Sequence, residues 1–311
     1  MQVVSNYQSN VYLKKDFYST AFQSKFKPET FNSHRAIDPI NRYFQNMFSH
    51  AAFASKKLWF PQNKNIKPHI KEVNLKASNS NINRAWDINP DNRQKYIIII
   101  HGLGHNITCL QDLYENILNK THFGILAPEY RNLTEEPAKT KKLFKTFSYK
   151  SMEEDFQAPV DYLVDKGIKK DNIFVLGHSF GGYPASIVGK NNENIGGVIL
   201  LAATNTYEYL YENIINGTKK RVPKYIKFFM KHFNFCKNKF KRLYPTEKLL
   251  ENTNVPVDII HAKDDTLVDI KYAERMREKC KNLNSFIKLD SGNHQMDDNK
   301  INAVVELLNT K

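Results

Sequence analysis

The sequence predicts an α/β fold in which helices cover both faces of an open, mainly parallel sheet. From residue 66 onward, short apolar runs of strand length alternate with helix-like stretches. The run at residues 96–100 is a tyrosine followed by four isoleucines, which is typical of a strand buried on both faces of a parallel sheet. His101 and Ser179 each follow closely on such a run, and ligands of open α/β sheets bind at the carboxyl ends of strands. We therefore expect the functional site at that edge of the sheet.

The periodicity gives an order of elements along this part of the chain. The expected strands lie at residues 70–75, 82–88, 96–100, 123–127, 173–176, 197–201, 255–261 and 286–289. The expected helices lie at residues 110–118 and 152–166, directly after Ser179, at residues 272–281, and from residue 300 onward. Turn-forming residues at 78–81 join the first two strands, and Gly167 ends the second helix.

The chain divides into three kinds of segment. Residues 1–65 form an N-terminal extension with one amphipathic helix, which begins at Asp38 followed by proline. Residues 66–203 and 254–311 form the α/β core. Residues 204–253 place about fifty residues between two consecutive strands, so we expect them to form a helical insertion.

Composition indicates a globular protein with a sizeable core, since 41% of its 311 residues are hydrophobic and 25% are charged. No stretch reaches the roughly 18 apolar residues that span a bilayer, and the first residues lack the basic and apolar regions of a secretory signal. Cys109, Cys236 and Cys280 are odd in number and widely spaced, which favours reduced thiols. We therefore expect a cytoplasmic protein.

The stretch from Ile173 to Tyr183 has the layout of a nucleophile elbow. An apolar strand runs into Gly-x-Ser-x-Gly and then directly into helix-compatible sequence. The sharp turn at Ser179 leaves no room for side chains at Gly177 and Gly181, and Gly182 lets the helix begin close to the sheet. The turn also presents the backbone N–H of Phe180 at a helix N-terminus, where a developing oxyanion is stabilised.

A serine needs a neighbouring base to take its proton, and that base needs an acid to orient it. The last expected strand is followed by His294, in a loop where an imidazole can reach Ser179. The strand before it is followed by Asp264 and Asp265, so the chain order is serine, acid, histidine. Asp258 lies within a strand and Asp290 lies at the end of one, so both are better explained as structural.

In this arrangement the sequence resembles the α/β-hydrolase superfamily, particularly its small serine hydrolases of the esterase, lipase and thioesterase type. The resemblance runs from about residue 66 to residue 311. It depends on His101-Gly102 after the isoleucine strand, on Tyr130-Arg131, on the serine elbow, on the acid loop (residues 262–268), and on Gly292-x-His294. It implies the α/β-hydrolase fold and a triad of Ser179, His294 and an acid.

The resemblance also bears on the choice of acid and on the oxyanion hole. The family acid usually lies in Gly-x-x-Asp-x-x-Val, and aligning Ala262 with the glycine places Asp265 at the acid, with Asp264 as the alternative. The implied oxyanion hole consists of the backbone N–H groups of Leu103 and Phe180. Where many relatives have Asp-Tyr-Arg-Gly, this chain has a glutamate, Glu129, and an asparagine in place of the glycine.

Metal binding is not expected. His101 and His105 are four residues apart, but they flank a loop and lack carboxylate or thiol partners at a suitable sequence spacing. His178 is expected to pack beside the elbow, and His261 to end a strand. We expect neither a metal nor another cofactor.

The net charge of +14 is concentrated in the predicted insertion, which occupies the position of the lid in relatives. Between Asn213 and Thr246 there are ten Lys or Arg residues and no Asp or Glu, so the rest of the chain carries 14 − 10 = +4. A helix opened by Pro223 places its apolar side chains on one face and lysines on the other. One interpretation is a lid whose lysines are solvated; the other is contact with an anionic membrane surface. Nucleic-acid binding is not expected, because the aromatic side chains lie on the face predicted to be buried and no nucleic-acid motif is present.

These observations favour a serine hydrolase that cleaves a carboxylic ester or thioester through an acyl-enzyme. A serine peptidase or amidase is the alternative within enzymes, because the same triad cleaves amides. A non-catalytic scaffold that binds a partner or a membrane through the basic insertion is the alternative from another class.

Overall fold

The structure, a computed structural model, describes residues 63–78, 82–102, 105–130, 149–204 and 245–311. The predicted N-terminal helix, Cys236, the helix opened by Pro223 and most of the predicted insertion lie outside these residues. In the described part of the chain, no helix is both long and apolar enough to cross a membrane. Neither Cys109 nor Cys280 forms a disulfide there.

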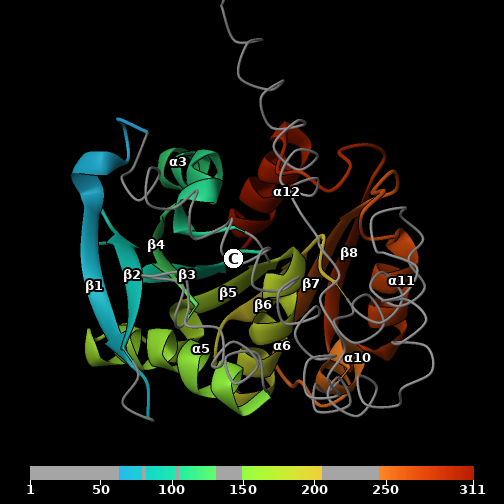
Figure 1. Cartoon of the computed structure of the whole chain (residues 1–311), viewed down its shortest axis with the longest axis horizontal. Coiled ribbons are helices and arrows are strands. Elements are labelled where there is room, and N and C mark those ends of the chain that lie inside the picture. Colours follow the sequence, from blue (N-terminus) through green and yellow to red (C-terminus); the bar gives the residue numbers. More distant parts are fainter. Residues whose placement is uncertain (1–62, 79–81, 103–104, 131–148, 205–244) are drawn as a thin grey trace, which may run out of the picture. The chain divides into compact units, whose positions relative to one another are not determined.

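The described chain contains one mainly parallel sheet of eight strands, in the order β1-β2-β4-β3-β5-β6-β7-β8 (Figure 1). The strands are β1 (Ile70–Lys76), β2 (Ile82–Ile88), β3 (Lys95–Ile100), β4 (Phe123–Pro128), β5 (Ile173–His178), β6 (Gly197–Leu201), β7 (Val257–Ala262) and β8 (Leu283–Leu289). The strands β1 and β2 are antiparallel to each other, and β2 is antiparallel to β4; every other pair is parallel. This is the α/β architecture that the sequence predicts.

The central strands are buried on both faces. The four isoleucines of β3 are 0–1% exposed, as expected of a β-branched run between two layers of helices. One layer contains α3 (Gln111–Lys120) and α12 (Asp298–Leu308), which pack against each other and share an apolar core with β3, β4 and β5. The other layer contains α5 (Tyr149–Asp165) and α6 (Gly182–Asn191), with α10 (Thr246–Leu250) against α6 and α11 (Ile270–Lys279) against α10 (Figure 1).

The element bounds follow from local chemistry. The helix α5 ends before Gly167, whose φ of +91° is open to glycine but costly for other residues. Asp269 and Asp297 cap α11 and α12, because each side chain accepts a hydrogen bond from a backbone N–H of the first turn. The short helix α10 packs on α6 and α11, so this end of the predicted insertion lies against the core.

Candidate active site

The candidate nucleophile, Ser179, lies in the sharp turn between β5 and α6. Its φ of +55° is a strained, left-handed conformation for a residue with a side chain. A Cβ atom at Gly177 would lie 2.2 Å from the carbonyl oxygen of Gly181, and one at Gly181 would lie 2.2 Å from that of Ile100. Both positions therefore exclude any side chain, as the elbow interpretation requires.

Two further glycines allow neighbouring segments to pack closely against the elbow. A Cβ atom at Gly182 would lie 2.5 Å from the Cβ of Ala203, so the lack of a side chain at Gly182 lets α6 begin close to the end of β6. A Cβ atom at Gly102 would lie 3.0 Å from the Cβ of Ser179, which brings the loop after β3 against the serine. Phe180 is buried, and its ring packs against those of Tyr130 and Tyr183. Leu103 lies outside the described residues, so its role in the oxyanion hole stays a prediction.

The fold brings Ser179, His294 and Asp265 together from the ends of three strands. His294 Nε2 lies 2.9 Å from Ser179 Oγ, and His294 Nδ1 lies 2.8 Å from Asp265 Oδ2. His294 and Asp265 are buried, at 7% and 6% exposure. Although 115 residues separate the serine from the histidine, they meet because parallel strands place their carboxyl ends at the same edge of the sheet.

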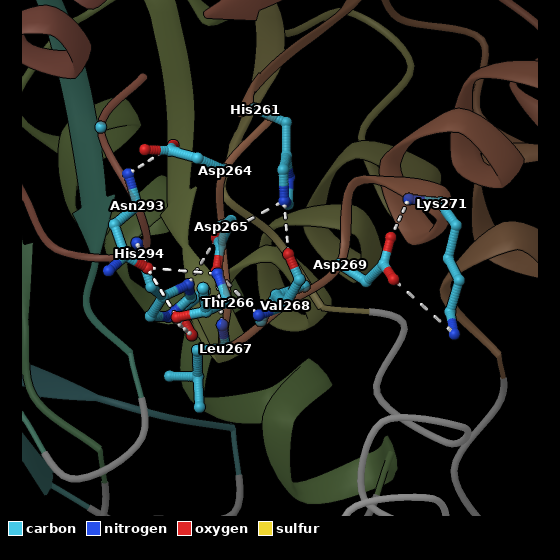
Figure 2. A network of polar contacts seen from close by, with 12 residues as sticks. His261, Asp264, Asp265, Thr266, Leu267, Val268, Asp269, Lys271, Asn293 and His294 are labelled. Atoms are coloured by element: carbon cyan, nitrogen blue, oxygen red, sulfur yellow. Dashed lines mark hydrogen bonds and ion pairs between the residues drawn. The ribbon is translucent and has the colours of Figure 1, made fainter. Parts of the chain in front are cut away.

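Asp265 lies within a network of polar contacts that its loop and His294 supply (Figure 2). Its Oδ1 accepts hydrogen bonds from the backbone N–H groups of Leu267 and Val268, at 2.9 and 2.8 Å. Burial alone would raise the pKa of Asp265, but the hydrogen bond and charge of His294, with the Val268 N–H, lower it below its usual value. A carboxylate only accepts hydrogen bonds, so Nδ1 of His294 carries a proton and Nε2 is the nitrogen that faces the serine.

Asp264, the alternative acid, points to a different partner. Its Oδ1 accepts a hydrogen bond from the backbone N–H of Asn293, at 2.8 Å (Figure 2). The Asn293 side chain in turn accepts from the backbone N–H and the hydroxyl of Thr266. Asp264 therefore contacts the loop that carries His294 and not the imidazole.

The two carboxylates expected to be structural have partners outside the Ser179–His294–Asp265 group. Asp258 lies in β7 and accepts hydrogen bonds from Asn284 and Ser285, while Asp290 is exposed and pairs with Lys263. His261 is buried behind the acid loop, with Nε2 2.8 Å from the carbonyl oxygen of Val268. Burial lowers the pKa of His261 despite that hydrogen bond and the nearby Asp265.

His178, the residue before the nucleophile, lies close to two other imidazoles: its ring is stacked with that of His105 and tilted against that of His294. Its ring centroid lies 5.5 Å from that of His294 and 6.0 Å from that of His105. Burial, followed by the charges of His294 and His105, holds the pKa of His178 well below its usual value. A neutral imidazole thus packs against the candidate base, beside the elbow as expected.

The sequence spacing did not reveal the carboxylate partner of His101. His101 Nε2 lies 2.7 Å from Glu129 Oε1, and both side chains are at most 1% exposed. Burial would lower the pKa of His101, but the charge and hydrogen bond of Glu129 outweigh it and raise the pKa above its usual value, which favours a protonated ring as the partner of Glu129. The pair forms because β3 and β4 are neighbours and bring together residues 28 positions apart, a separation that the search for closely spaced metal ligands does not cover.

The same pair supports the loop after β3. Glu129 also accepts hydrogen bonds from the backbone N–H groups of Ile107 and Tyr130, and the Tyr130 hydroxyl donates to the His101 carbonyl oxygen, at 3.0 Å. Both ring nitrogens of His101 thus have polar neighbours in Glu129 and the Gly102 carbonyl. In the described part of the chain, no three His, Cys, Asp or Glu side chains are grouped to hold a metal ion.

This sheet, with a serine elbow after its fifth strand and an acid and a histidine after its last two, is the α/β-hydrolase fold. The family model for the serine aminopeptidases, S33, matches residues 91–242. The chain thus has the α/β-hydrolase fold that its motifs predict, and nearly half of it matches this family model.

Solved structures share the fold at low sequence identity. An esterase of Pyrococcus furiosus is 20% identical with a TM-score of 0.56, over 82% of this chain and 91% of that one. Est1E of Butyrivibrio proteoclasticus is 18% identical with a TM-score of 0.57, over 77% of this chain and 96% of that one. A puromycin-hydrolyzing peptidase of Mycobacterium tuberculosis is 14% identical with a TM-score of 0.55, over 77% of this chain and 37% of that one. No curated protein sequence matches this chain.

Proposed function

We propose that this α/β-hydrolase is a serine hydrolase that cleaves a carboxylic ester or thioester. The observation that carries the proposal is the continuous path of hydrogen bonds from Ser179 through His294 to Asp265, at 2.9 and 2.8 Å. A nucleophile, a base within hydrogen-bond reach and an acid that orients the base are the three parts that acyl transfer requires. No cofactor takes part in this proposal.

The reaction proceeds in two acyl transfers. Ser179 Oγ attacks the acyl carbon while its proton passes to His294 Nε2, and Asp265 stabilises the imidazolium that results. The backbone N–H groups of Leu103 and Phe180 stabilise the oxyanion of the tetrahedral intermediate. The bond to the leaving group then breaks, and the leaving oxygen or sulfur takes the proton from His294. Water repeats the sequence on the acyl-enzyme, which releases the carboxylic acid and restores the serine.

The preference for an ester is supported by the solved structures that share this fold, several of which are esterases. We take a small acyl ester or an acylated molecule as the substrate class. The description of the matching family model as serine aminopeptidase favours one alternative, cleavage of an amide or peptide bond. Turnover of p-nitrophenyl esters of graded acyl length, compared with aminoacyl p-nitroanilides, separates the two activities.

The first test is covalent labelling of the serine. We expect a fluorophosphonate probe to label the protein and Ser179→Ala to abolish labelling, because the probe reacts with an activated serine hydroxyl. Ser186→Ala is the matched control: Ser186 lies in α6, the helix that follows the elbow, and its hydroxyl donates to the Gly182 carbonyl, 2.8 Å away. Absence of labelling in the folded protein would instead favour the non-catalytic scaffold.

A role for the basic insertion is a separate proposal. Residues 213–246 carry ten of the positive charges, and we propose that they bind an anionic membrane surface and admit an acyl substrate there. Co-sedimentation with vesicles is expected to increase when anionic phospholipid is added to phosphatidylcholine. Sedimentation that is indifferent to lipid charge would leave the segment as a solvated lid.

A further inference from the structure

Lys300 is a buried ammonium group close to the candidate active site. It lies in the first turn of α12 and is 0% exposed, among apolar neighbours on the buried face of that helix. The nearest carboxylate recorded for it is that of Asp297, whose Oδ1 lies 3.5 Å from Nζ and whose side chain is 33% exposed. Burial of a charge without a close, equally buried counter-ion is costly, so the position calls for a physical reason.

The Lys300 side chain extends back past the start of its helix. Side chains in a helix tilt toward its N-terminus, and Lys300 Nζ accordingly reaches the residues that precede α12. There it donates a hydrogen bond of 2.6 Å to the carbonyl oxygen of Gly292. Gly292 precedes His294 by two residues, so the lysine holds the loop that carries the proposed base.

The backbone of that loop is strained at Asn293, next to a glycine that takes a conformation open mainly to glycine. Gly292 has φ +143° and Asn293 has φ +47°, two consecutive residues in conformations that side chains rarely adopt. Such conformations persist where the surrounding contacts over-determine them. The acid loop supplies contacts from one side, through Asp264 to the Asn293 N–H and through Thr266 to the Asn293 side chain. Lys300 supplies the contact from the side of α12.

The space around Gly292 is closed by the same groups. A Cβ atom there would lie 2.8 Å from Lys300 Nζ and 2.6 Å from Asp297 Oδ2. Asp297 in turn accepts a hydrogen bond from the Lys300 backbone N–H, 3.0 Å away, so the start of α12 and the loop form one connected unit. Movement of the Lys300 side chain would free the Gly292 carbonyl and relax the loop.

We propose that Lys300 is a positioning residue, which holds the Gly292 carbonyl and thereby keeps His294 Nε2 within hydrogen-bond reach of Ser179 Oγ. The inference depends on the proposed serine hydrolase function and adds a residue to it. It explains a buried charge on an otherwise apolar helix face. This role differs from one in stability alone, because loss of the correct position of His294 lowers the rate of acyl transfer in a protein that remains folded.

The test compares Lys300→Met and Lys300→Gln with the unmodified protein. Methionine fills the space without a donor, and glutamine offers a neutral donor on a side chain one bond shorter. We expect Lys300→Met to lower both the rate of fluorophosphonate labelling and kcat for p-nitrophenyl acetate by about 10- to 100-fold, with little change in KM, since misplacement by about 1 Å has effects of this size. The labelling rate and kcat of Lys300→Gln are expected to fall between those of the unmodified protein and those of Lys300→Met.

The matched control is Lys166→Met. Lys166 Nζ donates to Asp87 Oδ2 and to the Tyr96 hydroxyl, both at 2.6 Å, in a network that does not involve the triad. This variant should lose thermal stability and keep its kcat. Lys300→Met should show the opposite pattern, with cooperative unfolding retained and kcat lowered.

The outcomes separate the two proposals. If the unmodified protein does not label, the serine hydrolase function itself is wrong. If it labels, and folded Lys300→Met labels at the same rate, only the positioning role is wrong. If Lys300→Met does not fold, Lys300→Gln decides alone: a neutral donor on a side chain one bond shorter weakens the 2.6 Å contact, so an unchanged labelling rate would overturn the inference.

Discussion

The assignment of Asp265 as the acid of the triad predicts opposite results for two neighbouring substitutions. Asp265 Oδ1 accepts from two backbone N–H groups, so in Asp265→Asn the amide oxygen must take that place. The amide NH₂ then faces His294 Nδ1 and donates to it, which moves the imidazole proton to Nε2. An imidazole with a proton on Nε2 cannot accept the proton of Ser179.

The size of the effect follows from this change of tautomer. A triad acid replaced by its amide lowers kcat by about 10⁴-fold, which corresponds to about 5.5 kcal/mol of transition-state stabilisation. Asp264→Asn, by contrast, keeps an amide oxygen for the Asn293 N–H, 2.8 Å away, and loses only an exposed charge. Its kcat should stay within about fivefold of the unmodified value, because even the complete loss of a hydrogen bond worth about 1 kcal/mol corresponds to a factor of about five.

The assay is initial-rate hydrolysis of p-nitrophenyl acetate, with thermal unfolding of each variant as the check on its fold. Asp264→Asn serves as the matched control for Asp265→Asn, since the two residues are adjacent and undergo the same change. A loss of about 10⁴-fold in Asp264→Asn, with near-normal turnover in Asp265→Asn, would refute the assignment. Equal, small losses in both variants would refute the triad itself.

Three further predictions concern stability and packing. Glu129→Gln removes one partner of the buried pair with His101 and should lower the free energy of unfolding by about 3 kcal/mol, measured in urea at pH 7. His178 stays neutral in the fold while its unfolded form gains a proton near pH 6.5, so acidification from pH 7.5 to 5.5 should destabilise the protein. His178→Phe should show a smaller loss over the same range. Gly181→Ala places a Cβ 2.2 Å from the carbonyl oxygen of Ile100 and should abolish labelling by the fluorophosphonate.

Each of these has an outcome that would contradict it. Unchanged urea unfolding in Glu129→Gln would mean that His101 and Glu129 are not an ion pair in solution. An identical acid dependence in His178→Phe would mean that His178 titrates normally in the fold. Gly167→Ala is the control for Gly181→Ala, because a Cβ atom at Gly167 meets nothing within 4 Å, although its φ of +91° remains unfavourable. That variant should lose stability and still label.

The sheet is the part of the fold that the sequence predicts best. The central strands are rich in β-branched residues because they are buried on both faces. The expected bounds of all strands but one agree with the structure within two residues. The strand β8 is the exception: we expected residues 286–289, and it begins at Leu283. This strand lies at the edge of the sheet and is only partly buried, so its first residues carry no apolar pattern.

The candidate site was predictable where a residue is fixed by its position after a strand. Ser179 and His294 follow β5 and β8 in the order that the fold requires. Side chains that act across the fold carry no such signal. Glu129 follows β4 as one residue of a weak motif, and only the neighbouring position of β3 shows that its partner is His101. Lys300 resembles any helical lysine, because helical periodicity cannot show that one side chain turns back over the start of its helix.

The choice between Asp264 and Asp265 shows why the geometry of a loop decides what spacing leaves open. Both aspartates follow β7, and successive residues in a turn point in different directions, so one can face the imidazole and the other can face the backbone beside it. In the structure Asp265 bonds to His294 Nδ1 while Asp264 bonds to the Asn293 N–H, and both contacts fall on the same strained loop. The two carboxylates thus have different roles: Asp265 orients the imidazole of the proposed base, and Asp264 fixes the backbone of the loop that carries it.

Lys300 contacts the same loop from α12, so the position of His294 depends on groups from the acid loop and from α12 together. We therefore expect Asp264→Ala combined with Lys300→Met to lower kcat by more than the product of the two single effects, since each remaining contact limits the movement that the loss of the other permits.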